Sequence, residues 1–487
     1  MEELESKEGG NILAGRNAFY SNSFLIFVIR FFPSFATLLV TLWYSKRLPV
    51  SVYGNYQQFW IQLNILYPLI CFGIHALSIT YSGGVLIRLA GHIKKWHYRV
   101  YALWVVALST VFAIIEWRIS EIPFIVSFLF ISAFSFSFIL ESILIVTRKF
   151  KVLVGVSFLF SIGYWAVHYY VLKGGFSVDA VFYYLLSVVL FRLVVYAMAA
   201  LSSLRKLRQG GEQDPMPAIP EVRLLWLHLG LYDVVQSLSN WIDKFIIALV
   251  LSSSSSAIYF NGSMSIPFLP LLLGAAGSAI LMQLAAGKKQ EGHEGIVALM
   301  NQSGRVLSSL VFPAFCYLFM YRQELILSFF GDKFSGSIGV FTLSLLVLPV
   351  RAYSFTTVLQ RLHKGKIINI GAIAEIILAV LLIYPLYTWI GLPGVALSFV
   401  ISTYLQAGFY LSWSSKLLGV SMAKLIPIRN WLIKLIVFST LFIGIHYGLC
   451  LFFAGKIALI LGGLFMSLVT AVSLWIELRT ARAQQVA

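Results

Sequence analysis

The sequence predicts an all-α integral membrane protein with about 14 transmembrane helices, arranged as two six-helix lobes in a pseudo-twofold relation plus a C-terminal helix pair. Of its 487 residues, 59% are hydrophobic and 11% are charged, whereas soluble domains carry about 25% charged residues. Runs of about 20 apolar residues, the length of a membrane-spanning helix, recur along nearly the whole chain. The runs are continuous and not alternating, which argues against a β-barrel.

The N-terminal segment and the cysteines narrow the class further. Residues 1–17, "MEELESKEGGNILAGRN", lack a short apolar core followed by a small-residue cleavage site, so we expect no cleaved signal peptide. Cys71, Cys316 and Cys450 all lie in apolar runs and have neither disulfide nor metal-ligand spacing. We therefore predict that all three are small core residues and that the protein uses no metal and no other cofactor.

Candidate spans can be placed by hydropathy, each about the length of a membrane-crossing helix. They cover residues 20–45, 56–80, 99–116, 122–147, 152–172, 178–203, 223–251, 257–286, 296–320, 337–361, 366–389, 393–415, 430–453 and 456–478. Because their number is even, both termini lie on the same side of the membrane. We predict that this side is the cytoplasm.

The distribution of basic residues sets this orientation. Lys and Arg concentrate in the connections that the prediction places in the cytoplasm, in accordance with the positive-inside rule. These connections are 88–99, 148–151, 205–223, 287–295, 361–366 and 416–429. The opposite side holds Lys46, Arg47, Arg118, Lys173, Arg322, Lys333 and Lys456. The net charge of +17 is therefore explained by membrane topology, and we expect no nucleic-acid partner.

The connections divide the chain into parts. Residues 204–222 form a long connection rich in Gly, Pro and charge, which we predict to be a cytoplasmic linker. Before it, residues 1–203 form the predicted N-terminal lobe with spans one to six. After it, residues 223–415 form the predicted C-terminal lobe with spans seven to twelve. Residues 416–487 hold the final helix pair and the tail.

A weak internal repeat relates the two lobes. Leu48, Ser51 and Tyr56 of "LPVSVYGNY" (48–56) recur at one constant offset in "LSSSSSAIY" (251–259). Each stretch follows the first span of its lobe. Two lobes that run in the same orientation and carry matched features are typical of a transporter built from parallel repeats around a central cavity.

Further matches extend the repeat. The turn "KFK" (149–151) and the turn "KGK" (364–366) both lie between the fourth and fifth spans of their lobes. The first offset also pairs Arg30 of span one with Asp233 of span seven. The repeat therefore predicts that these opposite charges face each other across the central cavity.

Span one contains an arginine within "FVIRFFPSFATLLVT". Arg30 shares one helix face with Ser34, Thr37 and Thr41, and Pro33 is expected to kink the helix. An ion at mid-membrane costs roughly 2.5–3.5 kcal/mol on insertion scales, so such residues usually face a protein interior or a wet cavity. A guanidinium at this place would bind a diphosphate through two parallel hydrogen bonds. The alternative is a structural ion pair or a snorkelling side chain.

Span seven carries ionisable groups in "LYDVVQSLSNWIDKF" (231–245). One helix face collects Asp233, Gln236, Ser237, Asn240 and Lys244, and Asp243 borders it. We interpret this face as a cavity wall on which Lys244 and Asn240 contact phosphate or sugar. Asp233 or Asp243 would serve as a proton or cation site. The alternative is a salt bridge that joins the two lobes.

Span two has a second polar stripe, formed by Gln57, Asn64, Pro68, Cys71, His75 and Ser78. The amides Gln57 and Asn64 suit sugar hydroxyls. Tyr56 and its aromatic neighbours could stack on sugar rings, but an aromatic belt at the membrane boundary is the favoured interpretation. We expect His75 to pack between helices and not to titrate.

Arg351, in "LVLPVRAYSF", is the second candidate for phosphate binding. For Arg192, Glu141 and Glu375 we expect packing or snorkelling. The sequence contains no Walker or G-x-G-x-x-G loop and no plausible Ser/His/Asp set, so we predict that the protein is not an enzyme. Without an ATP site, the energy must come from an ion gradient, the membrane potential, or substrate supply and removal.

Several stretches resemble a known family. "RLPVSVYGNYQQF" (47–59), "ELILSFFGDKFSGSIGVFTLSLLVL" (324–348) and "GLPGVALSFVIS" (391–402), together with the six-plus-six-plus-two spans, are similar to the polysaccharide-transport branch of the multidrug/oligosaccharidyl-lipid/polysaccharide (MOP) exporter superfamily. O-antigen flippases of the Wzx type belong to this branch. Ala257 departs from the pattern because it replaces glycine at the position equivalent to Gly54.

The resemblance implies a V-shaped, two-lobed fold that flips undecaprenyl-diphosphate-linked oligosaccharides by alternating access. The arginine set of the lipid II flippases does not match this chain residue by residue, apart from a basic residue in span one. We therefore expect a flippase of the bacterial inner membrane for cell-surface polysaccharide synthesis. The expected partners are the lipid-linked oligosaccharide, membrane lipids, a proton or sodium ion, and polysaccharide polymerase or export proteins.

Other functions stay open at this point. An ion-coupled multidrug antiporter of the same superfamily would need an acidic, aromatic cavity to bind cationic drugs. A lipid II flippase would act on a peptidoglycan precursor. A membrane scaffold in a polysaccharide synthesis complex would pair off its intramembrane charges and leave no wet cavity.

Overall fold

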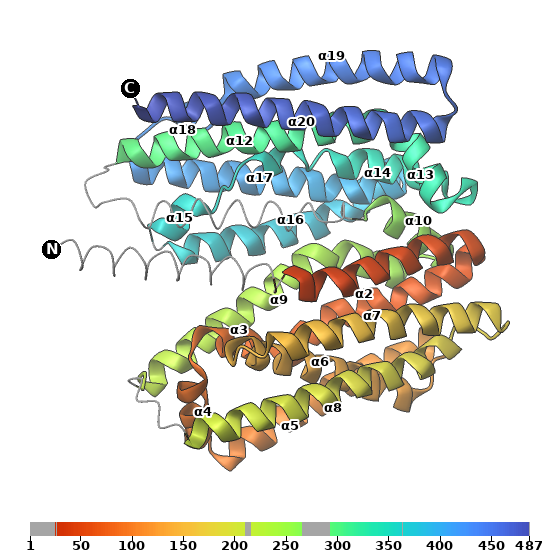
Figure 1. The fold of residues 1–487 in the computed structure, drawn as a ribbon, viewed down its shortest axis with the longest axis vertical. Helices are drawn as coiled ribbons and strands as arrows, with labels where there is room; N and C mark the ends of the chain where they lie inside the picture. Colours follow the sequence, from red (N-terminus) through yellow and green to blue (C-terminus); the bar gives the residue numbers. More distant parts are fainter. Residues whose placement is uncertain (1–24, 26, 210–215, 265–292, 363, 487) are drawn as a thin grey trace. The chain divides into compact units, whose positions relative to one another are not determined.

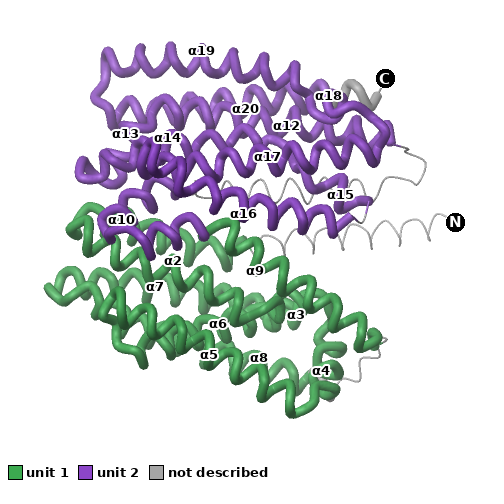
Figure 2. Tube along the Cα trace, turned by 180° about the vertical axis from the view of Figure 1, so that it is seen from behind, with its two compact units in different colours: residues 1–241 green, residues 242–487 purple. Residues whose placement is uncertain are grey.

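The computed structural model describes residues 25, 27–209, 216–264, 293–362 and 364–486. These residues form helices and connections and contain no strand, which confirms the predicted all-α class. The chain divides into two compact units, residues 1–241 and 242–487, coloured green and purple in Figure 2. The boundary between the units falls inside one long helix, α9. The predicted lobe and linker boundaries stay predictions.

Unit 1 is a bundle of long helices, shown in red to yellow-green in Figure 1. Its core lies where α6 packs against α3, α5 and α8. In chain order the unit contains the helix Phe27–Arg47, α2 (Val50–Cys71), α3 (Ile74–Thr80), α4 (Gly83–His92), α5 (Lys95–Ile119), α6 (Phe124–Val146), α7 (Phe150–Lys173), α8 (Ala180–Gln209) and most of α9 (Ile219–Val250).

Unit 2 is a second helical bundle, in which α12 packs against the final pair α19 and α20, and α16 packs against α17. After the end of α9, the unit contains α10 (Ser253–Gly262), α12 (His293–Met320), α13 (Arg322–Phe330), η1 (Asp332–Phe334), α14 (Ser337–Leu345), η2 (Pro349–Ala352), α15 (Thr357–Arg361), α16 (Gly365–Ile390), α17 (Leu392–Leu418), α18 (Met422–Leu425), α19 (Ile428–Phe452) and α20 (Gly455–Val486).

Among the described residues, 10 helices are long and apolar enough to cross a membrane, or up to 11 if the bent pair α2 and α3 is one span. The protein is therefore a multi-pass membrane protein, and the predicted number of 14 stays a prediction. Most of the predicted eighth span, residues 265–286, lies outside the described residues.

Two predicted spans are not continuous helices. The predicted span 337–361 was wrong as a single helix, because the chain forms α14, η2 and α15 with turns between them. Pro349 begins η2, where it cannot donate the backbone hydrogen bond that would continue α14. The predicted span 56–80 is bent by 55° between α2 and α3.

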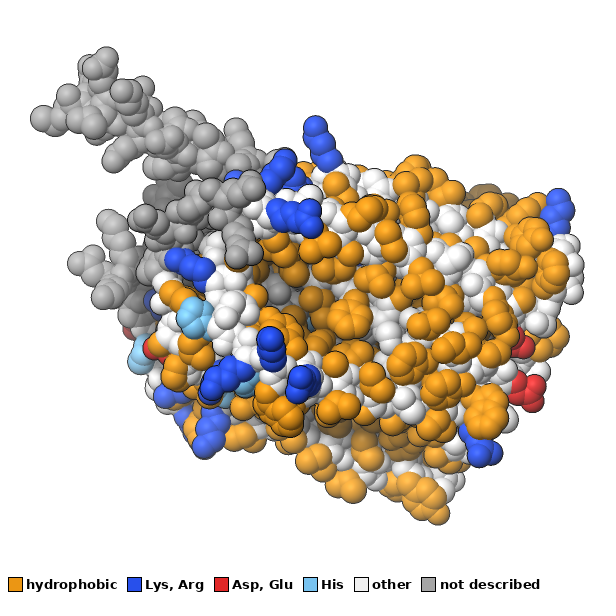
Figure 3. Space-filling view, turned by 90° about the horizontal axis from the view of Figure 1, so that it is seen from below, with side chains coloured by type: hydrophobic (Ala, Val, Ile, Leu, Met, Phe, Trp, Pro, Cys, Tyr) orange, Lys and Arg blue, Asp and Glu red, His pale blue; other side chains and the backbone are white. Residues whose placement is uncertain are grey.

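The surface of the helices fits a lipid environment. Figure 3 shows one face on which hydrophobic side chains form a wide cover and Lys and Arg gather mainly toward one end. Large apolar side chains such as Leu103 of α5 and Met198 of α8 are exposed. An exposed apolar surface of this extent is expected only where lipid, and not water, is the solvent.

The two equivalent stretches of the predicted repeat, residues 48–56 and 251–259, have similar local structure. α2 begins at Val50 and α10 begins at Ser253, each two residues after a repeat leucine. The repeat tyrosines Tyr56 and Tyr259 are both buried. Each unit therefore contains the same break followed by a helix that inserts a tyrosine into the core, which supports the repeat proposed from sequence.

Candidate functional site

The bend between α2 and α3 positions the first group of polar residues. Phe72 and Gly73 have positive φ angles of 34° and 71°, so the helix ends there and restarts in a new direction. Trp226 of α9 donates its indole N–H to the backbone oxygen of Phe72 over 2.7 Å. Ser237 of α9 donates to the backbone oxygen of Asn64 over 2.7 Å. These bonds satisfy carbonyls of α2 and hold α9 against the bend.

At this bend, His75 of α3 faces Asp233 of α9. The imidazole Nε2 lies 3.5 Å from the carboxylate Oδ2, and both side chains are 17% exposed. His75 Nδ1 is buried without a hydrogen-bond partner among the described residues. The structure thus places Asp233, predicted as an ion-coupling residue, beside a histidine that we had expected only to pack. Sequence reasoning missed the pair because the two residues lie on different helices.

Arg30 lies on the helix Phe27–Arg47 and is exposed. Within the part of the chain that the structure describes, its guanidinium takes part in no hydrogen bond or ion pair. Arg30 belongs to unit 1, as do His75 and Asp233. Arg30 is therefore a cation in an apolar segment without a partner anion among the described residues.

Arg192 of α8 differs from Arg30, because a carboxylate neutralises its charge. Its guanidinium lies 2.5 Å from the Glu141 carboxylate of α6, and both side chains are largely buried. The guanidinium also packs over the rings of Phe160 and Tyr196, 5.2 Å from each centroid. The expectation of a packing role for Arg192 and Glu141 agrees with this geometry.

In unit 2, Lys244 and Asp243 at the end of α9 form an ion pair with an Nζ–Oδ2 distance of 3.2 Å. Asp243 is buried and also accepts a hydrogen bond of 2.9 Å from the hydroxyl of Tyr259. The carboxylate is therefore engaged by two groups. Lys244, predicted to bind phosphate or sugar, has a neutralising partner next to it on the same helix.

Arg351 lies in η2 and is exposed. Among the described residues its guanidinium forms no hydrogen bond or ion pair, and Glu375 of α16 is a partly buried acid of the same unit that has other partners. Glu375 accepts hydrogen bonds from Thr403 and Gln406 of α17, at 2.9 Å and 2.7 Å. Arg351 is thus the second cation, with Arg30, that lies within a predicted span and has no partner carboxylate in contact.

The predicted amides occupy different environments. Gln57 is buried in α2, and its side-chain nitrogen has no hydrogen-bond partner among the described atoms. Asn64 donates its amide to the backbone oxygen of Trp60 over 2.7 Å. Asn240 is exposed on α9. The favoured interpretation of Tyr56 as part of a boundary belt was wrong, because its hydroxyl is buried beside His168 Nε2 at 2.8 Å.

A third charged group lies where the final helix pair meets α12, and sequence reasoning missed it. Lys434 of α19 lies 2.9 Å from the carboxylate of Glu477 on α20. Its ammonium also donates to the backbone oxygen of Arg305 and to Ser308 and Ser309 of α12. The sequence did contain a signal for this group, because Lys434 lies one helical turn inside the predicted span 430–453. From the sequence, we had counted it with the basic residues that flank the span.

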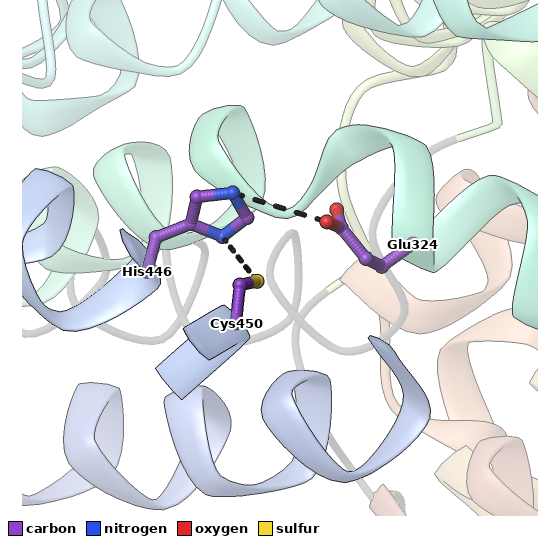
Figure 4. A group of neighbouring side chains, drawn as sticks. All are labelled: Glu324, His446 and Cys450. Carbon is purple, nitrogen blue, oxygen red and sulfur yellow. Dashed lines mark hydrogen bonds and ion pairs between the residues drawn. The ribbon is translucent and has the colours of Figure 1, made fainter. Parts of the chain in front are cut away.

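One group of described residues could hold a metal ion, and Figure 4 shows it. Glu324 of α13, His446 and Cys450 of α19 have donor atoms that all lie within 4.8 Å of one another. His446 Nε2 lies 3.8 Å from the Glu324 carboxylate, and Cys450 Sγ lies 3.9 Å from His446 Nδ1. Cys450 is exposed, so the prediction that it is a core residue was wrong. Carboxylate, imidazole and thiolate are ligands that Zn²⁺ accepts.

Residues 99–339 match the model of a family described as polysaccharide biosynthesis protein. No curated protein matches the chain at a significant level. The matched residues run from α5 to the end of unit 1 and on to α14 in unit 2.

Solved structures show the fold more completely. The lipid II flippase MurJ, in its inward closed conformation, is similar with a TM-score of 0.67 and 15% identity over 95% of this chain and 99% of MurJ. An inward-facing multidrug resistance MATE family transporter of the MOP superfamily has a TM-score of 0.54 and 14% identity over 79% of this chain and 94% of its own. A MATE protein in complex with MaD5 also has a TM-score of 0.54 and 14% identity, over 82% and 94%.

The chain therefore has the fold of the lipid II flippase MurJ and of MATE family transporters. The family match and the shared fold agree with the resemblance of the sequence to the polysaccharide-transport branch of the MOP superfamily.

Proposed function

We propose that the protein flips an oligosaccharide repeat unit, linked to undecaprenyl diphosphate, from the inner to the outer leaflet of the bacterial inner membrane by alternating access. The product would serve cell-surface polysaccharide synthesis. The match to a polysaccharide biosynthesis family and the fold shared with MurJ and MATE transporters support this proposal. Polysaccharide polymerase or export proteins would be its partners.

The main observation behind the proposal is which basic residues inside the predicted spans have a carboxylate partner and which do not. Arg192 and Lys244 have carboxylate partners, whereas Arg30 and Arg351 are exposed and have none among the described residues. An intramembrane cation without a counterion is costly, so it is retained where it has a ligand. A diphosphate supplies that ligand, because guanidinium groups bind its oxygens in pairs.

Other polar residues of the predicted spans fit the remaining roles. We assign contacts with sugar or phosphate to Asn240, Asn64, Gln57 and Lys244, and among them Asn240 is the exposed amide. For coupling to a proton or sodium ion we assign Asp233 first, because it is partly exposed and its Oδ2 has no hydrogen bond from the described residues. Asp243 is the weaker candidate, since Lys244 and Tyr259 already engage it.

The test is mass spectrometry of lipid extracts from host cells that lack the protein and are complemented with variants. Depletion should cause a polyprenyl-diphosphate oligosaccharide to accumulate, and the wild-type protein should clear it. Arg30→Gln should reduce clearance roughly tenfold or more, because a hydrogen bond to a charged group contributes about 1.5–3 kcal/mol. Arg351→Gln should act in the same direction.

The matched control is Lys366→Gln, which removes one charge from α16 near a predicted cytoplasmic connection and should leave clearance unchanged. An unchanged lipid pool on depletion would contradict the flippase and favour the ion-coupled multidrug antiporter. Asp233→Asn and Asp243→Asn would then be tested for loss of drug efflux. Accumulation of lipid II instead would identify a lipid II flippase.

A further inference from the structure

A cavity lies at one end of unit 2, between residues of α12, α18, α19 and α20. Figure 1 shows the ends of these helices gathered at one end of the unit. Its volume is about 940 Å³, which is large enough for a lipid headgroup or a small phosphate ester. The cavity contains none of the residues that we assign to the proposed transport site. A ligand bound there would therefore be separate from the proposed transport site.

The cavity is lined by cations from three different elements. Arg305 comes from α12, Lys424 from α18 and Arg429 from the first turn of α19. Arg305 has 37% of its side chain exposed, and Lys424 and Arg429 are both exposed. Of the amides in the lining, Asn301 donates to the backbone oxygens of Val297 and Lys424 and Asn430 donates to Glu477, whereas Gln302 adds a polar side chain beside these charges.

Among the described residues that line the cavity, one is acidic, and its charge is already compensated. The Glu477 carboxylate lies 2.9 Å from the ammonium of Lys434 and accepts a hydrogen bond of 3.0 Å from the Asn430 amide. Arg305 Nε lies 3.9 Å from the other oxygen of the same carboxylate. Lys434 is buried behind this carboxylate, so the acid and its lysine neutralise each other. The cavity keeps an excess of positive charge from Lys424, Arg429 and Arg305.

The backbone strengthens this bias toward anions. The 25-residue helix α19 begins at Ile428 within the cavity lining, and its N-cap residue Pro427 provides no side-chain cap. The first N–H groups of a helix and its dipole attract negative charge. Arginine, lysine and a helix N-terminus together form the donor set that phosphate groups prefer.

An apolar surface adjoins the cavity. Ile433 lines the cavity and is 53% exposed, and Ile436 and Val437 continue along α19 with their side chains outward. On α20, Trp475 and Ile476 are also exposed within two residues of Glu477. A ligand with a phosphate group and an attached acyl chain could therefore place each part in a suitable environment.

We propose that this cavity is a binding site for a phosphate ester, with Arg305, Lys424 and Arg429 as its ligands. The ester belongs either to an anionic membrane lipid or to a soluble metabolite, and both share the same phosphate chemistry. The bound phosphate group would contact cations of α12, α18 and α19 at the same time and so connect α12 and α18 to the final helix pair.

The experiment uses the purified full-length protein in phosphatidylcholine nanodiscs and in detergent. Native mass spectrometry measures binding of phosphatidylglycerol against phosphatidylcholine, and calorimetry measures binding of glycerol 3-phosphate. The cavity variant carries Arg305→Gln, Lys424→Gln and Arg429→Gln. The matched control carries Lys364→Gln, Lys366→Gln and Lys416→Gln, which remove the same charge from unit 2 outside the cavity lining.

We expect the wild type and the control to bind phosphatidylglycerol at least tenfold more tightly than the cavity variant does. Loss of glycerol 3-phosphate binding in the cavity variant, without a lipid preference, would support the site with a soluble ligand. Equal binding by all three proteins, or an equal loss in both triple variants, would overturn the proposal.

Single variants test the site even if the triple variant fails to fold. The side chains of Lys424 and Arg429 are exposed and form no hydrogen bond or ion pair with described residues, so Lys424→Gln and Arg429→Gln should fold normally. Each should weaken binding of the phosphate ester about twofold to fivefold without changing the elution volume on size exclusion. Normal binding by both would overturn the proposal even if the triple variant does not fold.

Discussion

At the scale of single residues, the role of a charged side chain in an apolar segment depends on whether a side chain of opposite charge contacts it. Arg192 has Glu141 at 2.5 Å and the rings of Phe160 and Tyr196 around it. Arg30 has no carboxylate in contact among the described residues. The same residue type therefore serves packing in one place and is available for a ligand in the other.

This contrast gives a prediction for stability. Arg192→Met should destabilise the protein by about 3 kcal/mol, because removal of one partner leaves the largely buried carboxylate of Glu141 uncompensated. Thermal unfolding in detergent measures the change as a lowered midpoint. The double variant Glu141→Gln with Arg192→Met should recover much of the loss, since no buried charge is left alone. An unchanged midpoint in Arg192→Met would show that the ion pair contributes nothing.

At the scale of elements, the bend between α2 and α3 depends on two glycines that meet across helices. A Cβ atom on Gly73 would lie 2.5 Å from the backbone nitrogen of Gly230, and the φ angle of Gly73 is 71°. A Cβ atom on Gly230 would lie 2.7 Å from the ring of Phe72. The bend and its contact with α9 hence require the smallest residue on both sides.

We predict that Gly73→Ala destabilises the protein by more than about 1–2 kcal/mol, since a left-handed backbone costs that much for an L-residue and the clash with Gly230 adds to it. Gly230→Ala should cost less, because the Phe72 ring can move. Thermal unfolding checks both. As a control, Gly155→Ala in α7 has open space around the new methyl group and should be neutral or stabilise by about 0.5–1 kcal/mol. Equal midpoints for Gly73→Ala and the control would refute the role of the bend.

At the scale of the whole molecule, the asymmetry of basic loops determines the predicted topology. Single cysteines in place of Lys173 and Lys333 should react with a membrane-impermeant maleimide in intact cells. Cysteines in place of Lys364 and Lys416 should react only after permeabilisation. The background must carry Cys450→Ser, because that thiol is exposed, whereas the thiols of Cys71 and Cys316 are buried. The reverse labelling pattern would invert the topology.

Hydrophobicity made the helices predictable, because a segment of about 20 apolar residues has to satisfy its backbone internally in a bilayer. The exceptions are local. The predicted span 337–361 is broken at Pro349, and the predicted span 56–80 bends at Phe72 and Gly73. Composition alone does not distinguish such breaks from a continuous helix, because the flanking residues are equally apolar.

The sequence by itself determined the all-α membrane class, the positions of the long helices, and which ionisable residues lie within apolar segments. These properties follow from transfer free energies, which depend on residue type and order along the chain. The tertiary structure alone decided which charges are neutralised. It joined Asp233 to His75, Arg192 to Glu141 and Lys434 to Glu477, because these partners lie on different helices and meet only through packing.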